Sequence, residues 1–262
     1  MHTGLEIDSI LKSFGERTIL ADVYLKCCRG DIIALFGRNG TGKSTLLNII
    51  FGTLKADRKF IRIDGKVING PAFRSGLIAY LPQHPSFPSH LKVSQIAELC
   101  IAPEDRKRFL ADKMLLRLRT SRICEISTGE QRYLEIKTTL FSPAPYILLD
   151  EPFSGVSPVV AEQLRILMTE SAKNHGIILT DHNFREVHKI ANRLTLLNEC
   201  YLKEIKQVEE LIPYGYYQPK SKPGKMEIKK GYPHGHPPNT EKISFILFHT
   251  SASHIPPVSP GI

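Results

Sequence analysis

The sequence predicts an α/β fold with a mostly parallel β-sheet, an N-terminal antiparallel β subdomain and an inserted α-helical subdomain. Two observations lead to this prediction. Short apolar runs rich in β-branched residues alternate with helical stretches over residues 1–217. Between about residues 87 and 137, by contrast, apolar positions keep helical spacing and no strand-like run intervenes.

The individual elements follow in chain order. Strands are expected in LEIDSILKSF, ILADVYLKC and DIIALFG, and a helix in GKSTLLNIIFG, which Gly52 is placed to end. A hairpin is expected in KFIRIDGKVI, because Asp64-Gly65 is a strong turn pair. Buried strands of a parallel sheet are expected in GLIAYLP, YILLD and GIILTD, and a crossover helix in SPVVAEQLRILMTESAKN.

The remaining segments have a different character. The helical subdomain, about 87–137, contains VSQIAELCI, PEDRKRFLADKMLLRLRT and GEQRYLEIKTTLF. Eight of the 18 prolines fall within residues 218–262, a composition that favours a poorly ordered segment. The sequence therefore predicts a domain over 1–217 and a Pro-, Lys- and His-rich tail over 218–262.

Composition and charge exclude several classes of protein. Apolar runs such as IIALF are far shorter than the roughly 20 residues that cross a bilayer, and no signal peptide is expected at the start. Five scattered cysteines without C-x-x-C spacing indicate reduced thiols in a cytosolic protein. The net charge is +9, but Lys and Arg are dispersed over the first 217 residues, so no specific nucleic-acid partner is expected.

A phosphate-binding loop is predicted by GRNGTGKST, which fits the pattern G-x-x-x-x-G-K-[ST] between a predicted strand and a predicted helix. Glycines let the backbone turn so that N–H groups point at phosphate oxygens, and the helix N-terminus adds a positive dipole end. Lys43 can reach the β- and γ-phosphates, and the Ser44 hydroxyl can ligate Mg²⁺. The pattern predicts a P-loop NTPase core whose loop comprises Gly37, Arg38, Asn39, Gly40, Thr41, Gly42, Lys43, Ser44 and Thr45.

Acidic and amide side chains are expected beside this loop. The apolar run YILLDEP delivers Asp150 to the carboxyl edge of the sheet, where it can hold Mg²⁺ through water. Glu151 leaves the strand in another direction and can polarise an attacking water. Gln83 follows LIAYLP and can reach the metal or the water, and His182 in ILTDH can contact a γ-phosphate. Each motif alone also fits an ordinary strand end.

Residues 5–217 resemble the ATPase subunit of an ATP-binding cassette (ABC) transporter. Phe14 in KSFGERTIL matches the aromatic residue that stacks on adenine, GRNGTGKST the Walker A loop, and Gln83 the Q-loop glutamine. ISTGEQR matches the family signature, usually written LSGGQ, and YILLDEP matches Walker B with its catalytic glutamate. SGVSP matches the D-loop, and His182 the switch histidine. Together, in this order, these motifs are very specific.

The resemblance implies ATP and Mg²⁺ as ligands and ATP hydrolysis coupled to transport. Two cassettes, as a homodimer or a pair with a second cassette, would pack head to tail around ATP, and a separate transmembrane permease subunit would dock near the Q-loop. The chain would be cytoplasmic and peripheral on the inner face of the membrane. The implied site residues are Glu151, His182 and Gln83 for catalysis, Ser44, Gln83 and Asp150 for the metal, and Phe14 and Gly37 to Thr45 for ATP.

The signature of one copy would contact the ATP of its partner through Ser127, Thr128, Gly129 and Glu130. Thr128 replaces the first glycine of the family pattern, and Glu130 replaces the glutamine. Ser127 and Glu130 also fit a capping box, so Glu130 is expected to support the loop rather than touch nucleotide. Ser157 stands where the D-loop usually has an aspartate, which bears on communication between the two ATP sites.

Two other functions are open. The same ATPase could serve a soluble process. DNA repair and translation are disfavoured, because repair-type members usually carry a very long coiled-coil insertion and translation-type members usually carry two cassettes, whereas this chain has one cassette and about 44 residues between Gln83 and Ser127. Iron–sulfur cluster assembly stays open. A GTPase or small-molecule kinase is disfavoured, because the chain has no N-K-x-D motif and STGEQR before LLDEP would be unexplained.

Overall fold

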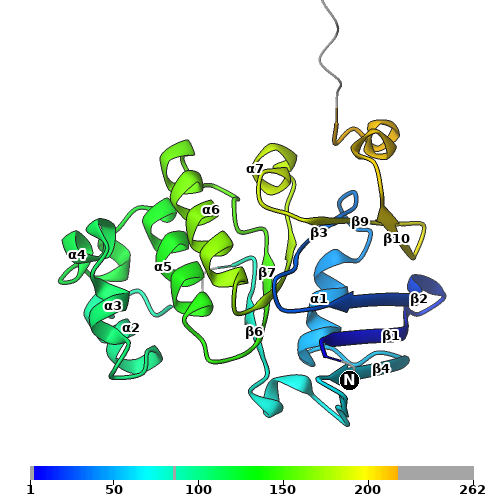
Figure 1. Ribbon diagram of the computed structural model, residues 1–262, viewed down its shortest axis with the longest axis horizontal. Coiled ribbons are helices and arrows are strands. Elements are labelled where there is room, and N and C mark those ends of the chain that lie inside the picture. The colour runs from blue at the N-terminus through cyan, green and yellow to red at the C-terminus, as the bar shows by residue number, and fades with distance from the viewer. Residues whose placement is uncertain (1–2, 85–86, 218–262) are drawn as a thin grey trace, which may run out of the picture. The chain divides into compact units, whose positions relative to one another are not determined.

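The computed structural model describes residues 3–84 and 87–217, which fall within one compact unit, Met1–Pro219. The predicted tail, 218–262, lies outside the described residues, so its order and the predicted domain boundary stay predictions. The strands of the described part form two sheets, labelled in Figure 1.

The small sheet is antiparallel, as predicted for the N-terminal subdomain. Its strands lie in the order β2-β1-β4-β5: β1 (Leu5–Phe14), β2 (Arg17–Cys27), β4 (Arg58–Ile63) and β5 (Lys66–Val67). The predicted hairpin joins β4 to β5. Asp64 and Gly65 both have positive φ, 46° and 83°, which a two-residue hairpin turn requires.

The large sheet is mostly parallel and carries strands in the order β10-β9-β3-β8-β7-β6. Their bounds are β3 (Ile32–Phe36), β6 (Ile78–Leu81), β7 (Tyr146–Asp150), β8 (Gly176–Thr180), β9 (Arg193–Asn198) and β10 (Tyr201–Ile205). Every residue of β7 and β8 is buried, as predicted, and so is every residue of β3. In β6, also expected to be a buried strand, Ala79 and Tyr80 are only partly buried. β9 and β10 are not predicted from the sequence. Their connecting turn, Glu199-Cys200, has positive φ at both residues without glycine, so it carries no turn signal.

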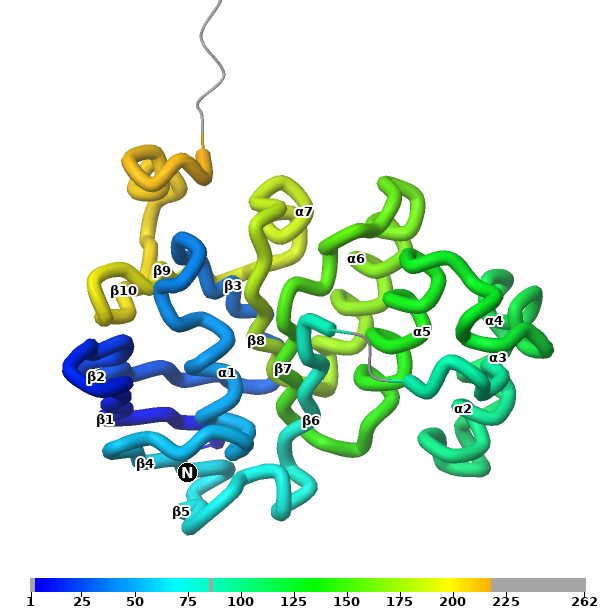
Figure 2. The backbone as a smooth tube through the Cα atoms, turned by 180° about the vertical axis from the view of Figure 1, so that it is seen from behind, coloured from blue at the N-terminus to red at the C-terminus, as the bar shows by residue number. Residues whose placement is uncertain are grey.

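Side chains of the large sheet alternate between two cores. Ile33 and Leu35 of β3 face a core shared with helix α1 (Lys43–Phe51) and the small sheet. Ala34 and Phe36 face the other core, with helices α5 (Thr128–Leu140) and α6 (Pro158–Ala172). Figures 1 and 2 show α1 with the small sheet on one side, and α5 with α6 on the other.

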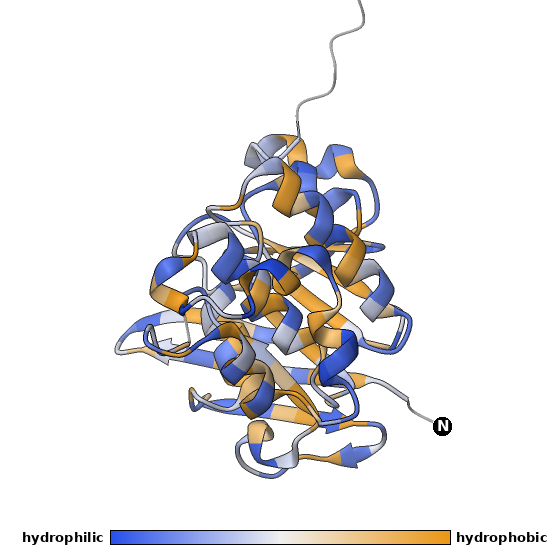
Figure 3. Cartoon of the chain, turned by 90° about the vertical axis from the view of Figure 1, so that its left-hand side faces the viewer, coloured by the Kyte–Doolittle hydropathy of each residue, from blue (hydrophilic) through white to orange (hydrophobic). Residues whose placement is uncertain are grey.

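Helices occupy the segment in which a helical subdomain is expected. Its helices are α2 (Val93–Cys100), α3 (Arg106–Leu110), α4 (Lys113–Leu118) and the first part of α5. The stretch PEDRKRFLADKMLLRLRT divides at Asp112, whose carboxylate caps α4 by accepting the Leu115 N–H at 2.8 Å. In Figure 3 these helices carry apolar and polar stretches side by side, as surface helices do. No helix among residues 3–84 and 87–217 is long and apolar enough to cross a membrane.

The shared direction of four strands positions the functional residues. β3, β6, β7 and β8 are parallel, so their carboxyl ends meet at one edge of the sheet. The residues that follow them are Gly37 after β3, Gln83 after β6, Glu151 after β7 and His182 after β8. The short helix α7 (Phe184–His188) and the 3₁₀ segments Ala72–Ser75, Ile123–Glu125 and Val208–Tyr214 complete the described part.

Candidate nucleotide site

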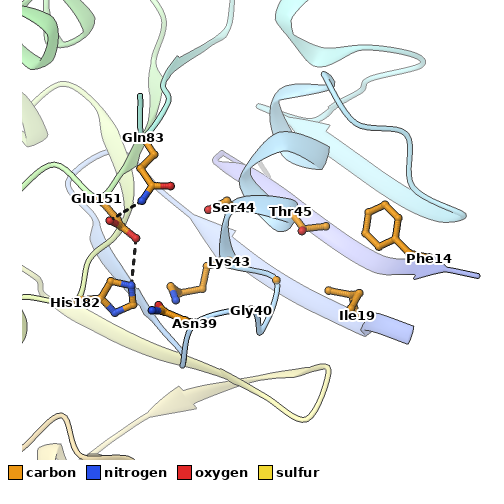
Figure 4. A pocket seen from close by; sticks show the side chains of 11 residues that line it. Phe14, Ile19, Asn39, Gly40, Lys43, Ser44, Thr45, Gln83, Glu151 and His182 are labelled. Carbon is orange, nitrogen blue, oxygen red and sulfur yellow. Dashed lines mark hydrogen bonds and ion pairs between the residues drawn. The ribbon is translucent and has the colours of Figure 1, made fainter. Parts of the chain in front are cut away.

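A cavity of about 430 Å³ opens at this edge of the sheet (Figure 4). Its described lining residues are Phe14, Ile19, Asn39, Gly40, Gly42, Lys43, Ser44, Thr45, Gln83, Glu151 and His182. All but Ile19 are among the residues named from the sequence. Gly37, Arg38 and Thr41 belong to the same loop but do not line the cavity. The fold thus brings motifs from five separate parts of the chain to one place.

The phosphate loop has the backbone geometry that its glycines allow. Gly40 and Gly42 have φ of 78° and 106°, and a Cβ on Gly42 would lie 2.6 Å from Ile19 Cγ2. Lys43 is 7% exposed, and its ammonium donates to the carbonyl oxygens of Gly37 at 2.6 Å and Arg38 at 3.2 Å. Burial lowers the pKa of Lys43, and the carboxylates of Glu151 and Asp150 oppose this shift. The loop therefore places a cation beside the start of α1, where phosphate oxygens could replace the two carbonyl oxygens as its partners.

Asp150, the last residue of β7, is 2% exposed and does not line the cavity, although the next residue, Glu151, does. Thr180 Oγ1 donates to its Oδ1 at 2.5 Å, and Tyr80 Oη to its Oδ2 at 3.4 Å. Across residues 3–84 and 87–217, no cluster of three or more His, Cys, Asp or Glu residues could hold a metal by itself. Mg²⁺ commonly takes one or two carboxylates together with water and substrate phosphates, so Asp150 and Ser44 fit a metal that arrives with a nucleotide.

Glu151 combines backbone strain with a firmly held carboxylate. Its φ is 51°, a left-handed conformation that costs about 1–3 kcal/mol for a residue other than glycine. Its N–H donates to Thr180 O at 3.0 Å, which helps to hold this conformation. Gln83 Nε2 donates to Glu151 Oε2 at 2.9 Å, and His182 Nε2 lies 3.2 Å from Oε1 (Figure 4). The glutamate therefore faces the cavity between two polar side chains.

Arg132 joins the signature helix α5 to these loops, a role that the sequence analysis misses. Its guanidinium donates to Pro82 O at 3.0 Å, Glu151 O at 3.1 Å and Asp150 O, and it is paired with Glu135 at 3.3 Å. Arg132 is 6% exposed. No local pattern signals this role, because its partners come from two distant loops.

The signature stretch forms the capping box at the start of α5. Ser127 N donates to Glu130 Oε2 at 2.9 Å, and Glu130 N donates to Ser127 Oγ at 3.3 Å. The backbone hydrogen bond from Ser127, its hydroxyl and the Arg117 guanidinium together lower the pKa of Glu130. None of Ser127, Thr128, Gly129 and Glu130 lines the cavity, so within one chain the signature is separate from the phosphate loop.

The predicted adenine contact, Phe14, and the D-loop residue Ser157 each lie at the end of a secondary-structure element. Phe14, at the end of β1, is 51% exposed, and Lys12 Nζ lies 4.9 Å from its ring centroid. Ser157 is the N-cap of α6, where its hydroxyl accepts the Val160 N–H at 3.4 Å. A serine at this D-loop position therefore performs the capping that an aspartate could also perform.

Comparisons with known proteins agree with this geometry. A family profile described as ABC transporter matches residues 20–154. A probable ABC transporter ATP-binding protein of Azorhizobium caulinodans is 34% identical over 202 residues, covering 72% of this chain and 72% of that protein. The lipopolysaccharide export system ATP-binding protein LptB of Acidithiobacillus ferridurans is 32% identical over 209 residues, covering 74% and 86%. A solved structure of the ATP-binding subunit of an ABC transporter aligns with a TM-score of 0.71 at 25% identity, covering 82% and 94%.

Proposed function

The chain belongs to the ABC transporter family as an ATP-binding subunit that hydrolyses ATP to drive transport, and we propose that it works as one half of a head-to-tail dimer. The curated relatives described above are subunits of transporters or of an export system, which favours transport over the alternative of a soluble, non-transport ATPase. The observation that carries the proposal is that the phosphate loop and the signature, which the resemblance places on the same ATP, are separate within one chain. The cavity holds the phosphate loop, Gln83, Glu151 and His182, while the signature lies outside it.

ATP is proposed to bind in the cavity, with its triphosphate on the loop from Gly37 to Thr45 and its adenine against Phe14. Lys43 exchanges its hydrogen bonds to the carbonyls of Gly37 and Arg38 for the β- and γ-phosphate oxygens. Ser44 and Asp150, joined by Gln83, are the proposed protein contacts of Mg²⁺. When bound, Mg²⁺ would neutralise the charge that develops on the β- and γ-phosphate oxygens.

Glu151 is the proposed general base. Its carboxylate already faces the cavity, between Gln83 Nε2 and His182 Nε2. In this position it can hold a water molecule and accept its proton as the water oxygen attacks the γ-phosphorus. His182 can then donate a hydrogen bond to the γ-phosphate, which helps to stabilise the transition state.

The partner's signature is proposed to complete the site. The capping box orders the N-terminus of α5, and the partner's ATP would meet the backbone N–H groups of this first turn and its positive dipole end. Ser127 and Gly129 are the proposed contacts. Glu130 is turned back onto Ser127 and Arg117, so it supports the turn.

A separate transmembrane permease is the proposed partner, with this chain cytoplasmic and peripheral on the inner face of the membrane. The permease is expected to dock near Gln83. Phe87 and Leu91, which follow Gln83, pack against the helical core, whereas Pro88 is exposed. The exposed residues Pro88, Ser89 and His90 are therefore the proposed contact.

Glu151→Gln tests this mechanism. The variant keeps the shape of the side chain but cannot accept a proton, so we expect ATP binding to persist and the rate of hydrolysis to fall by about 10²–10⁴-fold. ATP should also trap a dimer, detectable by light scattering after size-exclusion chromatography. Glu170→Gln, an exposed carboxylate on α6 paired with Lys173, is the matched control. Hydrolysis by Glu151→Gln at the wild-type rate would show that another group is the base.

A further inference from the structure

Asp181, between β8 and His182, has no role in the mechanism described above. It is 3% exposed, and both of its carboxylate oxygens accept backbone hydrogen bonds. Oδ2 accepts the N–H of Phe153 at 2.8 Å, and Oδ1 accepts the N–H of Asn183 at 2.7 Å. One buried carboxylate therefore joins two segments of chain.

These two segments carry the two groups that flank the reaction. Phe153 is two residues after Glu151, and Asn183 is the residue after His182. The 3.2 Å distance between His182 Nε2 and Glu151 Oε1 thus depends on two loops that Asp181 connects. Glu151 also has a strained backbone, which persists only if its surroundings hold it.

The chemistry of the bridge requires a carboxylate. Both partners are N–H donors, and an ionised carboxylate is acceptor-only at both oxygens. An amide at this position would turn its own NH₂ group toward one of the two donors and leave a buried N–H unpaired. Burial raises the pKa of Asp181, and the backbone N–H groups of Asn183 and Phe153 oppose this shift because they favour the ionised form.

We propose that Asp181 is a positioning residue that fixes Glu151 and His182 relative to each other through the backbone. The proposal rests on the roles given above to those two residues. The two hydrogen bonds of Asp181 go to Phe153 and Asn183 and not to the phosphate loop. The proposal therefore concerns catalysis and not ATP binding. Loss of the bridge should therefore misplace the catalytic pair and leave the ATP cradle intact.

The test compares Asp181→Asn and Asp181→Ser with wild type in the full-length chain, with magnesium and ATP. Serine supplies one oxygen, so it can replace at most one arm of the bridge. We expect the kcat for hydrolysis to fall about 10–100-fold in both variants, since a misplacement of about 1 Å can cost 10²-fold. The dissociation constant for ATP should stay within about twofold of wild type, because the phosphate loop keeps its contacts.

Asp31→Asn is the matched control. Asp31 also accepts a backbone N–H, from Cys28 at 2.8 Å, but it precedes β3 and so lies at the opposite edge of the same sheet. It should lose thermal stability without a change in kcat. A wild-type kcat in folded Asp181→Asn overturns the proposal, and so does failure of both Asp181 variants to fold, since Asp181 would then be structural. Glu151→Gln is measured alongside: if it remains active, the proposed base is wrong, whatever Asp181 does.

Discussion

Glu130 illustrates, at the scale of one residue, how a departure from the family signature is accommodated. Its carboxylate accepts hydrogen bonds from both the backbone N–H and the hydroxyl of Ser127 and pairs with Arg117. The negative charge is thereby turned toward donors of its own chain. Ser127 and Gly129 are left as the proposed contacts for the partner's ATP.

Glu130→Gln keeps a side chain that can complete the capping box but removes its charge from the first turn of α5, so the free energy of unfolding at neutral pH should fall by about 0.3–1 kcal/mol. The pKa of Glu130 is lowered in the folded state, so its charge stabilises the fold above its unfolded pKa. This contribution is lost as the pH falls through the folded pKa, and the two proteins should then converge. Urea titrations at several pH values measure the difference. A difference that is constant with pH would contradict this account.

At the scale of elements, the sequence predicts those segments that carry their own signal. β7 and β8 are short apolar runs bounded by turn residues, and the Asp64-Gly65 hairpin has a specific turn pair. β9 and β10 are missed because their turn uses Glu199 and Cys200 in place of glycine.

The C-terminal segment of the described part adds a contact that no motif signals. Tyr216 Oη accepts the N–H of Gly37, the first residue of the phosphate loop, at 3.0 Å. Its ring packs on Phe36, with centroids 5.1 Å apart. A hydroxyl 179 residues away in sequence therefore satisfies a buried backbone group that begins the nucleotide site.

Tyr216→Phe keeps the ring and removes the hydroxyl, which leaves the buried Gly37 N–H unpaired. We expect the free energy of unfolding to fall by about 1–3 kcal/mol, the cost of an unsatisfied buried donor. Chemical denaturation measures it, with Tyr217→Phe as the neighbouring control. Equal stability of Tyr216→Phe and wild type would show that Gly37 finds another partner at no cost.

At the scale of the whole molecule, the parallel sheet explains why local motifs predict the candidate site so well. Asp150 ends β7, while Glu151, Gln83 and His182 each follow a recognisable strand, and parallel strands end at one edge. Arg132, Asp181 and Tyr216 act on the same edge through hydrogen bonds to the backbone of distant segments. Such contacts depend on tertiary packing, so a single sequence carries no periodic or spaced signal for them.

The central claim is that each ATP is shared between the phosphate loop of one copy and the signature of another. Two variants separate these halves. Lys43→Ala removes the ammonium from the phosphate loop. Gly129→Asp places a carboxylate in the signature, and its Cβ has room, since the nearest atoms, Val156 Cα and Val160 Cγ2, are both 3.9 Å away. In a dimer of either variant alone, both ATP sites carry that variant's defect.

Mixing the two variants provides the most direct test, with ATP hydrolysis as the measurement. In a mixed dimer, the phosphate loop of the Gly129→Asp copy meets the signature of the Lys43→Ala copy, so one site is intact. Each variant alone should be strongly impaired, and the mixture should hydrolyse ATP faster than the sum of the rates of the two separate variants. Wild-type activity of Gly129→Asp alone, or a mixture no faster than that sum, would contradict the shared site.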